Sequence, residues 1–309
     1  MKQNRDEFEI FEYYVYGHKL LSNVQLPMLT PYINQCTICD VTLVVKADNK
    51  CKNDGDWQIT TSFQGDNCVL KIGNKVVYHI DCAKNSIEVK TCDLAWMKST
   101  ILNLPFALYF AIKDMILLHA SALIDNNGDV IPLCAPKGTG KTTLSLGLSR
   151  FFDFYSDDTV MVRLHEGELQ CFCGSSWIKL NEDSFKLLGV KQEFDSLQKN
   201  VQGKAYYNLG DDLQFEHGKI KKLFFLRRIG NEVKMAKITQ PFTRKIFLHA
   251  NICGSTILGY EYCKKIEKSK VFSYILTNTE FIKITIQDDI ELFENTVEKV
   301  KYMIDDTDS

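Results

Sequence analysis

The sequence lacks several features that would assign it to a common class of protein. None of its apolar runs approaches the roughly 18 uninterrupted residues that a membrane-spanning helix needs. Its start, MKQNRDEFEI, is charged and contains no apolar signal-peptide segment. Internal repeats and low-complexity segments are also absent. These absences argue against a membrane-spanning, secreted or repeat protein, and we expect a cytoplasmic one.

The chain also has little net charge. Its 37 lysine and arginine residues nearly balance its 39 aspartate and glutamate residues. No global field therefore draws the protein to nucleic acid or to an anionic membrane, and we expect neither as a partner. Hydrophobic residues, by contrast, make up 45% of the 309 residues, which is ample for a buried core and for more than one domain.

Cysteine is plentiful, since the chain has 11. Disulfide scaffolds are typical of small secreted chains, so reduced thiols buried in strands are the better interpretation. Cys36 and Cys39 form a C-x-x-C, and Cys171 and Cys173 form a C-x-C. A zinc site needs four ligands at matched spacing, and no third and fourth ligand is evident for either pair.

Residues 1–93 are predicted to form a β-rich N-terminal domain. Short apolar or alternating segments, such as CDVTLVVKA, NCVLKIG and KVVYHI, are separated by turn-forming Asn, Asp and Gly, which predicts antiparallel strands and hairpins. Over residues 94–114 the apolar residues recur at helical spacing, with Pro105 opening a new helix or kinking one. We interpret this segment as a linker helix at a domain junction.

Residues 115–309 are predicted to form an α/β domain, α+β if the whole chain is considered. Two strands, 115–124 and 129–134, flank the turn signal Asn-Asn-Gly, and a helix follows over 141–150. A strand is expected to return in FDFYSDD. The later expected elements are strands around MVRLHEGELQCF, a helix near 182–188, strands KIKKLFFLRR and EVKMAKI, a helical stretch over 241–260, a basic solvated loop KKIEKSK, a strand FIKITI and a closing helix.

The segment CAPKGTGKTT, residues 134–143, fits a phosphate-binding loop whose first glycine is replaced by Ala135. It follows an apolar strand and opens an apolar-periodic helix, as this motif requires. In such a loop the backbone N–H groups face the β-phosphate, and the helix N-terminus adds a positive dipole end. The residues predicted to bind the phosphates of ATP are Lys137, Gly138, Thr139, Gly140, Lys141, Thr142 and Thr143.

Two side chains of this segment carry specific expectations. Lys141 is expected to reach the β- and γ-phosphate oxygens, and the Thr142 hydroxyl to join the Mg²⁺ shell. Ala135 demands only a negative φ or slight crowding at the loop entry, so it does not argue against binding. The alternative interpretation is a strand-to-helix turn that is rich in glycine without binding a nucleotide.

A pair of carboxylates follows the loop closely. Asp157 and Asp158 lie 16 and 17 residues after Lys141, which leaves room for one helix and one short strand. A right-handed crossover would bring the end of that strand beside the loop, where ligands of open α/β sheets bind. One carboxylate can then bind Mg²⁺ and the other accept the proton of an attacking hydroxyl. The residue pattern leaves open which does which, and a solvated or helix-capping pair is the alternative.

His119 lies on the strand that precedes the loop, where a lone histidine is more often a buried structural residue than a catalytic one. However, the run from His119 through Asp158 resembles the catalytic core of the HPr kinase/phosphorylase C-terminal domain. That core has a strand beginning with histidine, a hairpin, a phosphate loop and an Asp-Asp pair in this order, and its fold resembles the core of phosphoenolpyruvate carboxykinase. The resemblance implies a catalytic role for His119.

Weaker similarity covers nearly the whole chain. YGHKLLSNVQLPML, residues 16–29, is similar to the opening of HPr-kinase-related proteins of peptide-maturation clusters, including lasso-peptide kinases. GKAYYNLG, residues 203–210, resembles their lysine-tyrosine segment, which implies that Lys204 binds phosphate or substrate. The second HPr-kinase signature, with its acidic metal ligand, has no clear counterpart in LHEGELQCFCGSSWIKL. This departure argues against HPr as the substrate.

Three basic residues have a simpler interpretation when the resemblance is set aside. Arg227 and Arg228 close an apolar strand and could stabilise transferring charge, but their position at a strand end already explains them. A single lysine in a polar segment, such as Lys204, is usually solvated.

Together these features predict a kinase that uses ATP and Mg²⁺ to phosphorylate a Ser or Thr hydroxyl of a small peptide or protein. By resemblance, a ribosomally made precursor peptide is one such acceptor, and the N-terminal domain is a candidate for recognising it. The predicted catalytic residues are His119, Lys141, Asp157 and Asp158, and the predicted metal ligands are Thr142, Asp157 and Asp158. A small-molecule kinase, a nucleotide sensor without turnover and a hydrolase stay open as alternatives, as does a homo-oligomer.

Overall fold

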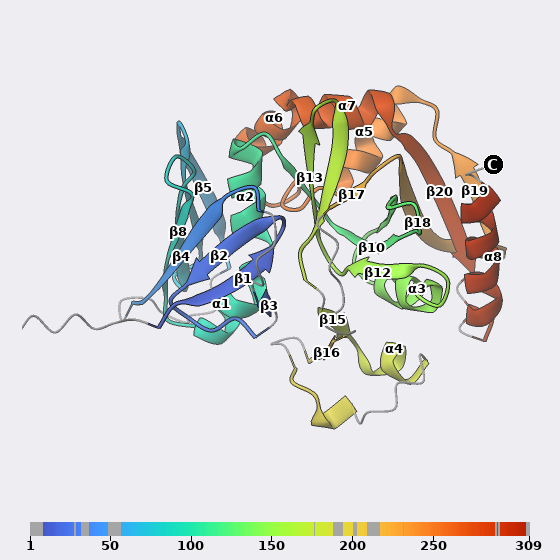
Figure 1. Ribbon diagram of the computed structural model, residues 1–309, viewed down its shortest axis with the longest axis horizontal. Helices are drawn as coiled ribbons and strands as arrows, with labels where there is room; N and C mark the ends of the chain where they lie inside the picture. Colours follow the sequence, from blue (N-terminus) through green and yellow to red (C-terminus); the bar gives the residue numbers. More distant parts are fainter. Residues whose placement is uncertain are drawn as a thin grey trace, which may run out of the picture.

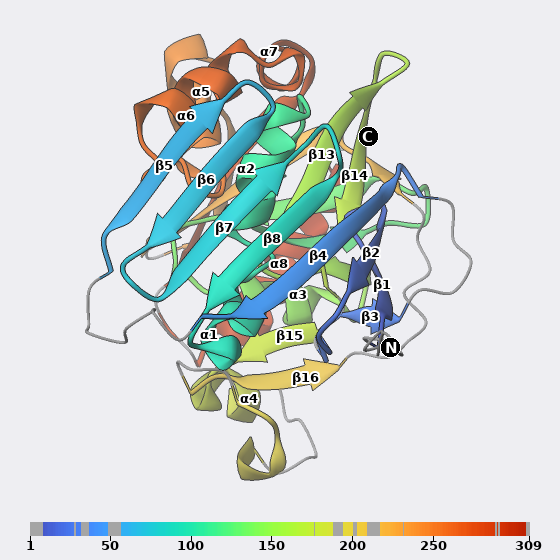
Figure 2. The same cartoon turned by 90° about the vertical axis from the view of Figure 1, so that its left-hand side faces the viewer.

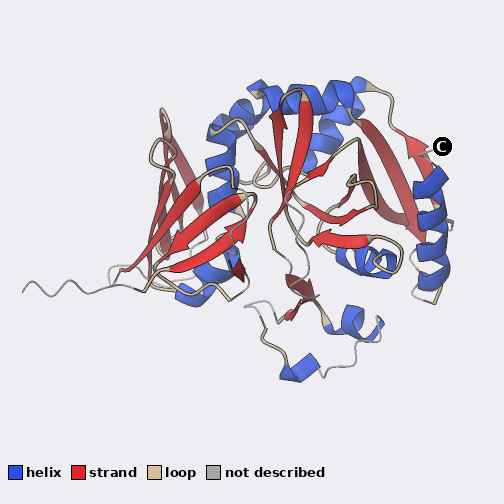
Figure 3. Ribbon diagram, in the orientation of Figure 1, coloured by secondary structure: helices blue, strands red, loops and turns tan. Residues whose placement is uncertain are grey.

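A computed structural model gives the fold, which is mixed α/β. It describes residues 9–27, 29–31, 37–48, 57–175, 177–187, 194–199, 203–208, 217–230, 232–287, 289 and 291–306. These residues form four sheets of eight, six, four and two strands. The eight-stranded sheet contains the N-terminal strands, and the other three belong to the rest of the chain (Figures 1 and 3).

The N-terminal sheet has the strand order β3-β1-β2-β4-β8-β7-β6-β5. Its strands are β1 (Phe11–Val15), β2 (His18–Ser22), β3 (Thr30–Pro31), β4 (Asp40–Ala47), β5 (Ile59–Gln64), β6 (Asn67–Ile72), β7 (Val76–Asp81) and β8 (Ser86–Thr91). Five of its seven strand pairings are antiparallel, as the sequence predicts, but β4 runs parallel to both β2 and β8. Parallel neighbours need a longer crossover connection, and apolar alternation along a strand does not reveal strand direction.

Two helices, and not one, occupy the expected linker between residues 94 and 114. α1 (Leu94–Thr100) begins after Asp93, whose side chain accepts a hydrogen bond from the N–H of Trp96 at 2.9 Å. α2 (Leu104–Ile112) has Pro105 in its first turn, where a missing N–H costs nothing. α2 is buried along most of its length and lies between the N-terminal sheet and the rest of the molecule (Figures 1 and 2).

The turn between β1 and β2 connects the N-terminal sheet to the C-terminal part. Tyr16 and Gly17 both have positive φ values, 53° and 72°, and a Cβ on Gly17 would lie 2.4 Å from the Phe172 ring. The Tyr16 hydroxyl donates to the carbonyl of Leu102 at 2.9 Å and is hydrogen-bonded to the Thr159 hydroxyl at 2.5 Å. Tyr16 is fully buried, so the N-terminal sheet is anchored directly beside the residue that follows Asp158.

His18 makes the stability of this junction depend on pH. Its side chain is fully buried, and its Nδ1–H donates to the Tyr16 carbonyl at 2.7 Å. Burial lowers the pKa of His18 from 6.5 to about 4, so the folded protein binds this proton less tightly than the unfolded chain. Stability is therefore lost as the pH falls from 6.5 towards 4, and we expect the loss to reach about 3 kcal/mol.

Chemical denaturation between pH 4 and pH 7 checks this expectation. His18→Gln should flatten the pH dependence in this range, whereas His79→Gln, at an exposed position of β7, should leave it unchanged. An equal slope in the wild type and the His18 variant would contradict the assignment.

The six-stranded sheet has the order β12-β10-β11-β18-β20-β19. Its strands are β10 (Ala120–Ile124), β11 (Val130–Cys134), β12 (Asp153–Ser156), β18 (Lys222–Gly230), β19 (Lys234–Lys237) and β20 (Glu280–Gln287). The prediction of a single strand over 115–124 is wrong. This segment is divided into β9 (Ile116–Leu118), which pairs with β13 in another sheet, and β10. The chain changes sheets at His119, whose N–H donates to the carbonyl of Asn251 at 2.7 Å.

The remaining strands form two smaller sheets. β13 (Val160–His165), β14 (Glu168–Cys173), β17 (Gly218–Lys219) and β9 make the four-stranded sheet, and β15 (Trp177–Leu180) pairs with β16 (Ala205–Asn208). The β15–β16 pair extends below the six-stranded sheet together with α4 (Glu182–Leu187) and the single turn η1 (Phe194–Ser196) (Figure 1).

Helices α3 (Lys141–Leu148), α5 (Pro241–Ala250), α6 (Tyr260–Lys268), α7 (Lys270–Asn278) and α8 (Phe293–Asp306) complete the described part of the fold. The prediction of a basic loop over 264–270 is wrong, because most of this segment lies in α6. Tyr262 and Ile266 are four residues apart and buried, which places the lysines of this segment on the outer face. Among the described residues, no helix combines the length and apolar composition needed to cross a membrane.

Candidate functional site

The order of the six-stranded sheet brings three strand ends to one edge. β10 is antiparallel to both of its neighbours, β11 and β12, so these two run in the same direction. β18 is parallel to β11, with Phe225 opposite Cys134. Consequently the glycine loop (residues 135–140) after β11, Asp157 after β12, and Arg228 near the end of β18 lie on the same side of the sheet.

The glycine loop leads directly into α3. Gly138 and Gly140 have φ values of 85° and 96°, which residues with a Cβ rarely adopt. Gly140 caps α3, and no side chain bonds to the cap. The first N–H groups of a helix have no partner within it, so this end of α3 can accept an anion. Ala135, at the loop entry, is buried.

Lys141 is the first residue of α3 and is only 7% exposed. Its Nζ turns back and donates to the carbonyl of Ala135 at 2.7 Å. Burial lowers the pKa of Lys141, although the nearby carboxylates of Asp158 and Asp157 oppose this effect. A buried cation next to open helix N–H groups is well suited to an anionic ligand.

Asp157 faces the first turn of α3. Its Oδ1 accepts a hydrogen bond from the Thr142 hydroxyl at 2.8 Å, and its Oδ2 accepts one from the N–H of Lys179 at 3.2 Å. The side chain is buried, at 4% exposure. Burial, followed by the charge of Asp158, raises the pKa of Asp157.

Asp158 points to different partners, because its backbone is in the left-handed region with φ of 67°. Its Oδ1 lies 3.4 Å from His119 Nδ1, and its Oδ2 lies 3.3 Å from Lys179 Nζ. Burial raises the pKa of Asp158, but Lys179, His119 and Lys141 together outweigh it and lower the pKa overall. The pKa values of the two neighbouring aspartates are therefore shifted in opposite directions, as is common where two carboxyl groups have different roles.

His119 sits at the change of sheets between β9 and β10, with its ring turned towards Asp158. Burial, followed by the charge of Lys141, lowers the pKa of His119, although Asp158 opposes the shift. The imidazole is therefore neutral at pH 7 and can exchange a hydrogen bond with a hydroxyl or a phosphate oxygen.

A cleft of about 340 Å³ opens at this edge of the sheet. The sequence-predicted residues that line it are His119, Lys137, Gly138, Gly140, Lys141, Thr142, Thr143, Asp157, Asp158 and Lys204. Thr139 instead lines an adjoining hollow on the side of β20 and α8, and its hydroxyl donates to the carbonyl of Pro136 at 2.9 Å. The structure thus brings together ten of the eleven residues in one cavity, including Lys204 from the distant β15–β16 region.

Two of the charged residues that line the cleft, Lys179 and Arg228, are absent from the sequence-based set. Lys179, at the centre of β15, contacts both aspartates and lines the cleft. Its neighbours Ile178 and Leu180 are buried, so strand alternation predicts that Lys179 points the other way, but alternation does not show that this face borders a cleft. Arg228 also lines the cleft, a position that the apolar character of its strand does not predict.

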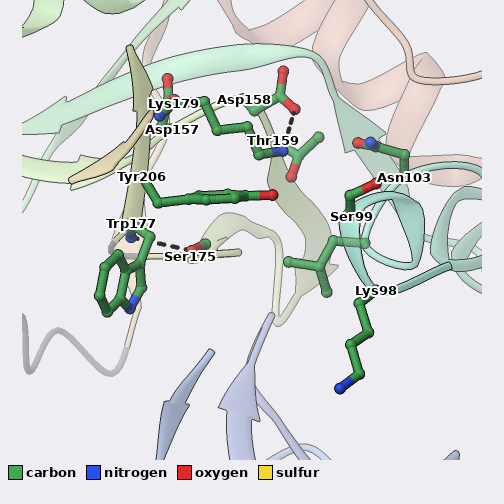
Figure 4. Close-up of a pocket in the computed structure, with 11 residues that line it drawn as sticks. Lys98, Ser99, Asn103, Asp157, Asp158, Thr159, Ser175, Trp177, Lys179 and Tyr206 are labelled. Carbon is green, nitrogen blue, oxygen red and sulfur yellow. Dashed lines mark hydrogen bonds and ion pairs between the residues drawn. The ribbon is translucent and has the colours of Figure 1, made fainter. Parts of the chain in front are cut away.

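A second, small cavity adjoins the cleft at the aspartates. This cavity, the neck, has a volume of about 30 Å³, and its walls include Asp157, Asp158, Lys179, Ser99 and Tyr206. In Figure 4 the Tyr206 ring lies across the middle of the neck, with Asp158 and Lys179 above it and Lys98 below. At the end away from the glycine loop, the cleft is therefore bordered by α1, which belongs to neither the loop nor the six-stranded sheet.

The oxygen atoms of Thr142 and Asp157 are of the type that Mg²⁺ prefers, and their 2.8 Å separation places them on one side of the cleft. In the described part of the chain, no group of three or more His, Cys, Asp or Glu side chains is arranged to hold a metal ion.

Of the two cysteine pairs predicted from the sequence, the first includes Cys36, which lies outside the described residues. Burial raises the pKa of Cys173 to about 11 and that of Cys171 well above its ordinary value.

Comparison with known proteins adds little to this geometry. No protein-family model and no curated protein matches the sequence. Among solved structures, the HPr(Ser) kinase/phosphatase from Coxiella burnetii is similar over 62% of this chain and 94% of its own, with 14% sequence identity and a TM-score of 0.29. A TM-score this low does not establish a shared function or substrate.

Proposed function

We propose that the protein is a phosphotransferase that moves the γ-phosphate of ATP to a hydroxyl group, with residues 135–142 as its phosphate-binding loop. One observation carries the proposal. Thr142 is bonded to one carboxylate of an adjacent aspartate pair, and the other carboxylate contacts a histidine and a lysine across the same cleft. A loop that only senses a nucleotide does not need the second carboxylate with its own partners.

On the donor side, the N–H groups at the start of α3 and the Lys141 ammonium bind the phosphate chain. Lys141 exchanges the Ala135 carbonyl for phosphate oxygens, which are stronger acceptors of its charge-assisted hydrogen bonds. Thr142 and Asp157 would hold Mg²⁺, which when bound neutralises charge on the phosphate oxygens. Arg228 is a further cation on the wall of the cleft.

On the acceptor side, Asp158 receives the proton of the attacking hydroxyl. Its lowered pKa keeps it ionised at neutral pH, and His119 and Lys179 hold the carboxylate from two sides. As the acceptor oxygen bonds to the γ-phosphorus, the bond from that phosphorus to the β–γ bridging oxygen breaks. ADP leaves, and the proton remains on Asp158 until it passes to solvent.

The order of His119, the glycine loop and the Asp-Asp pair supports an HPr-kinase-like core with phosphoenolpyruvate-carboxykinase-like topology. The same resemblance supports a Ser or Thr of a small peptide or protein as the acceptor, with a ribosomally made precursor peptide as one case. A small-molecule acceptor uses the same donor chemistry, and the assay below separates the two.

Transfer from ATP labelled at the γ-phosphate tests the proposal directly. With Mg²⁺ and a set of serine and threonine peptides, including any encoded beside the gene, label should enter a peptide faster than it appears as free phosphate. Removal of Mg²⁺ with EDTA should stop the transfer. Phosphate release that is unchanged by acceptors would instead identify a hydrolase, and nucleotide binding without turnover would identify a sensor.

A further inference from the structure

An apolar groove lies directly beyond the neck. It has a volume of about 400 Å³ and is formed between the chain after β2 and helix α1. Leu26, Pro27 and Leu29 line it from the chain after β2, and Leu94 and Leu102 line it from α1 and the turn that follows. The phosphate cleft, in contrast, is lined mainly by polar and charged groups.

The groove adjoins the cavities that hold the candidate catalytic residues. Ser99 and Asp158 line both the cleft and the neck, while Lys98, Ser99 and Tyr206 line both the neck and the groove. The three cavities therefore adjoin one another, and Tyr206 lies between the aspartates and Lys98 (Figure 4). A molecule bound in the groove is thus placed next to the candidate catalytic residues.

The size of the neck restricts what can pass through it. Its volume of about 30 Å³ has room for one or two water-sized groups. A hydroxymethyl group matches this space better than a sugar or an aromatic ring does. A reacting hydroxyl on a short, unbranched arm therefore suits the neck, with the bulk of the molecule in the groove.

We propose that the groove binds an acceptor peptide in an extended conformation, with a serine side chain in the neck and an apolar side chain, one or two residues away, in the groove. This proposal rests on the phosphotransferase function above. An extended strand places neighbouring residues about 3.3 Å apart along the chain, so the groove is within reach of residues next to the serine. Lys98, at the junction of neck and groove, disfavours a basic neighbour at that position.

A serine-centred peptide library with labelled ATP tests the acceptor side. We expect enrichment of Leu, Ile, Val or Phe at one position within two residues of the phosphorylated serine. Replacing that apolar residue with Asn should lower kcat/KM about tenfold or more, since burying such a side chain contributes to binding on this scale.

Leu94→Glu tests the protein side without disturbing the fold. Leu94 is 42% exposed and is the first residue of α1, where a carboxylate interacts favourably with the helix dipole. The variant should abolish the preference for the apolar residue and raise KM for the peptide, with nucleotide affinity unchanged. Phe242→Glu is the matched control, because Phe242 is an exposed apolar residue in the first turn of α5 and lies outside the three cavities.

Each outcome is decisive. Peptide phosphorylation without apolar selection, or with selection that survives Leu94→Glu, overturns the groove and leaves the phosphotransferase standing. Lys141-dependent transfer to small hydroxyl compounds but to no peptide likewise overturns the groove and leaves the phosphotransferase standing. Absence of any Lys141-dependent transfer overturns both proposals, whereas selection that is lost in Leu94→Glu and kept in Phe242→Glu supports the groove.

Discussion

Replacing Lys141 with methionine is expected to abolish phosphoryl transfer while the protein stays folded. Lys141 is the only basic residue of the glycine loop and α3 whose ammonium is buried at the loop, where it contacts the Ala135 carbonyl at 2.7 Å. Removing a charge that stabilises the transferring phosphate in a water-poor site lowers rates by about 10²–10³-fold or more. We expect a comparable loss in kcat, measured by label transfer under saturating acceptor.

Lys137→Met provides the matched control for this variant. Lys137 lies in the same loop and lines the same cleft, but its side chain is exposed. The substitution retains its backbone N–H, which is the group expected to face the phosphates, so transfer should fall far less than in Lys141→Met. Equal losses in the two variants would mean that Lys141 has no special role.

The thermal stability of Lys141→Met distinguishes lost chemistry from lost structure. Burial lowers the pKa of this lysine, which means that the folded, nucleotide-free protein is destabilised by holding the charge. Methionine has a similar shape and no charge. The melting temperature of the free variant should therefore equal or exceed that of the wild type, while the rise on adding ATP should be lost.

Local sequence order was sufficient to predict how the residues of the proposed donor half lie relative to one another. The glycine spacing predicts a loop that opens a helix, and the short distance to Asp157 predicts one helix and one strand between them. The structure places the Thr142 hydroxyl 2.8 Å from Asp157, as a crossover of that length allows. Only one helix and one strand separate these residues, so their proximity in the fold can be predicted from the number of residues between them.

The acceptor half depends on contacts that the sequence does not encode locally. Lys179 reaches Asp158 because the chain leaves the four-stranded sheet after β14, and β15 pairs with β16, whose residues come later in the chain. Ser99 reaches the neck because Tyr16 anchors the N-terminal sheet and α1 beside Thr159. The position of its strand predicts that His119 lies near the loop, but only the resemblance implies a catalytic role, and alternation predicts an unbroken strand where the chain changes sheets.

Isosteric replacement of the two aspartates is expected to separate the two halves of the reaction. Asp158→Asn removes the proton acceptor, so kcat should fall by about 10²–10⁴-fold with nucleotide affinity nearly unchanged. Asp157→Asn removes the carboxylate bonded to Thr142, so the Mg²⁺ concentration needed for ATP binding should rise. Transfer by Asp158→Asn at the wild-type rate, with Asp157→Asn inactive, would reverse the two roles.

The same two variants should shift the melting temperature of the nucleotide-free protein in opposite directions. The pKa of Asp158 is lowered on folding, so its carboxylate contributes stability above the ordinary aspartate range and loses it as the pH falls through its folded value. The pKa of Asp157 is raised, so at neutral pH its charge opposes folding. Asp158→Asn should therefore melt below the wild type at pH 7 and Asp157→Asn above it. Melting curves at pH 7 measure both shifts without any substrate, so this assignment of the pair can be checked before the acceptor is known.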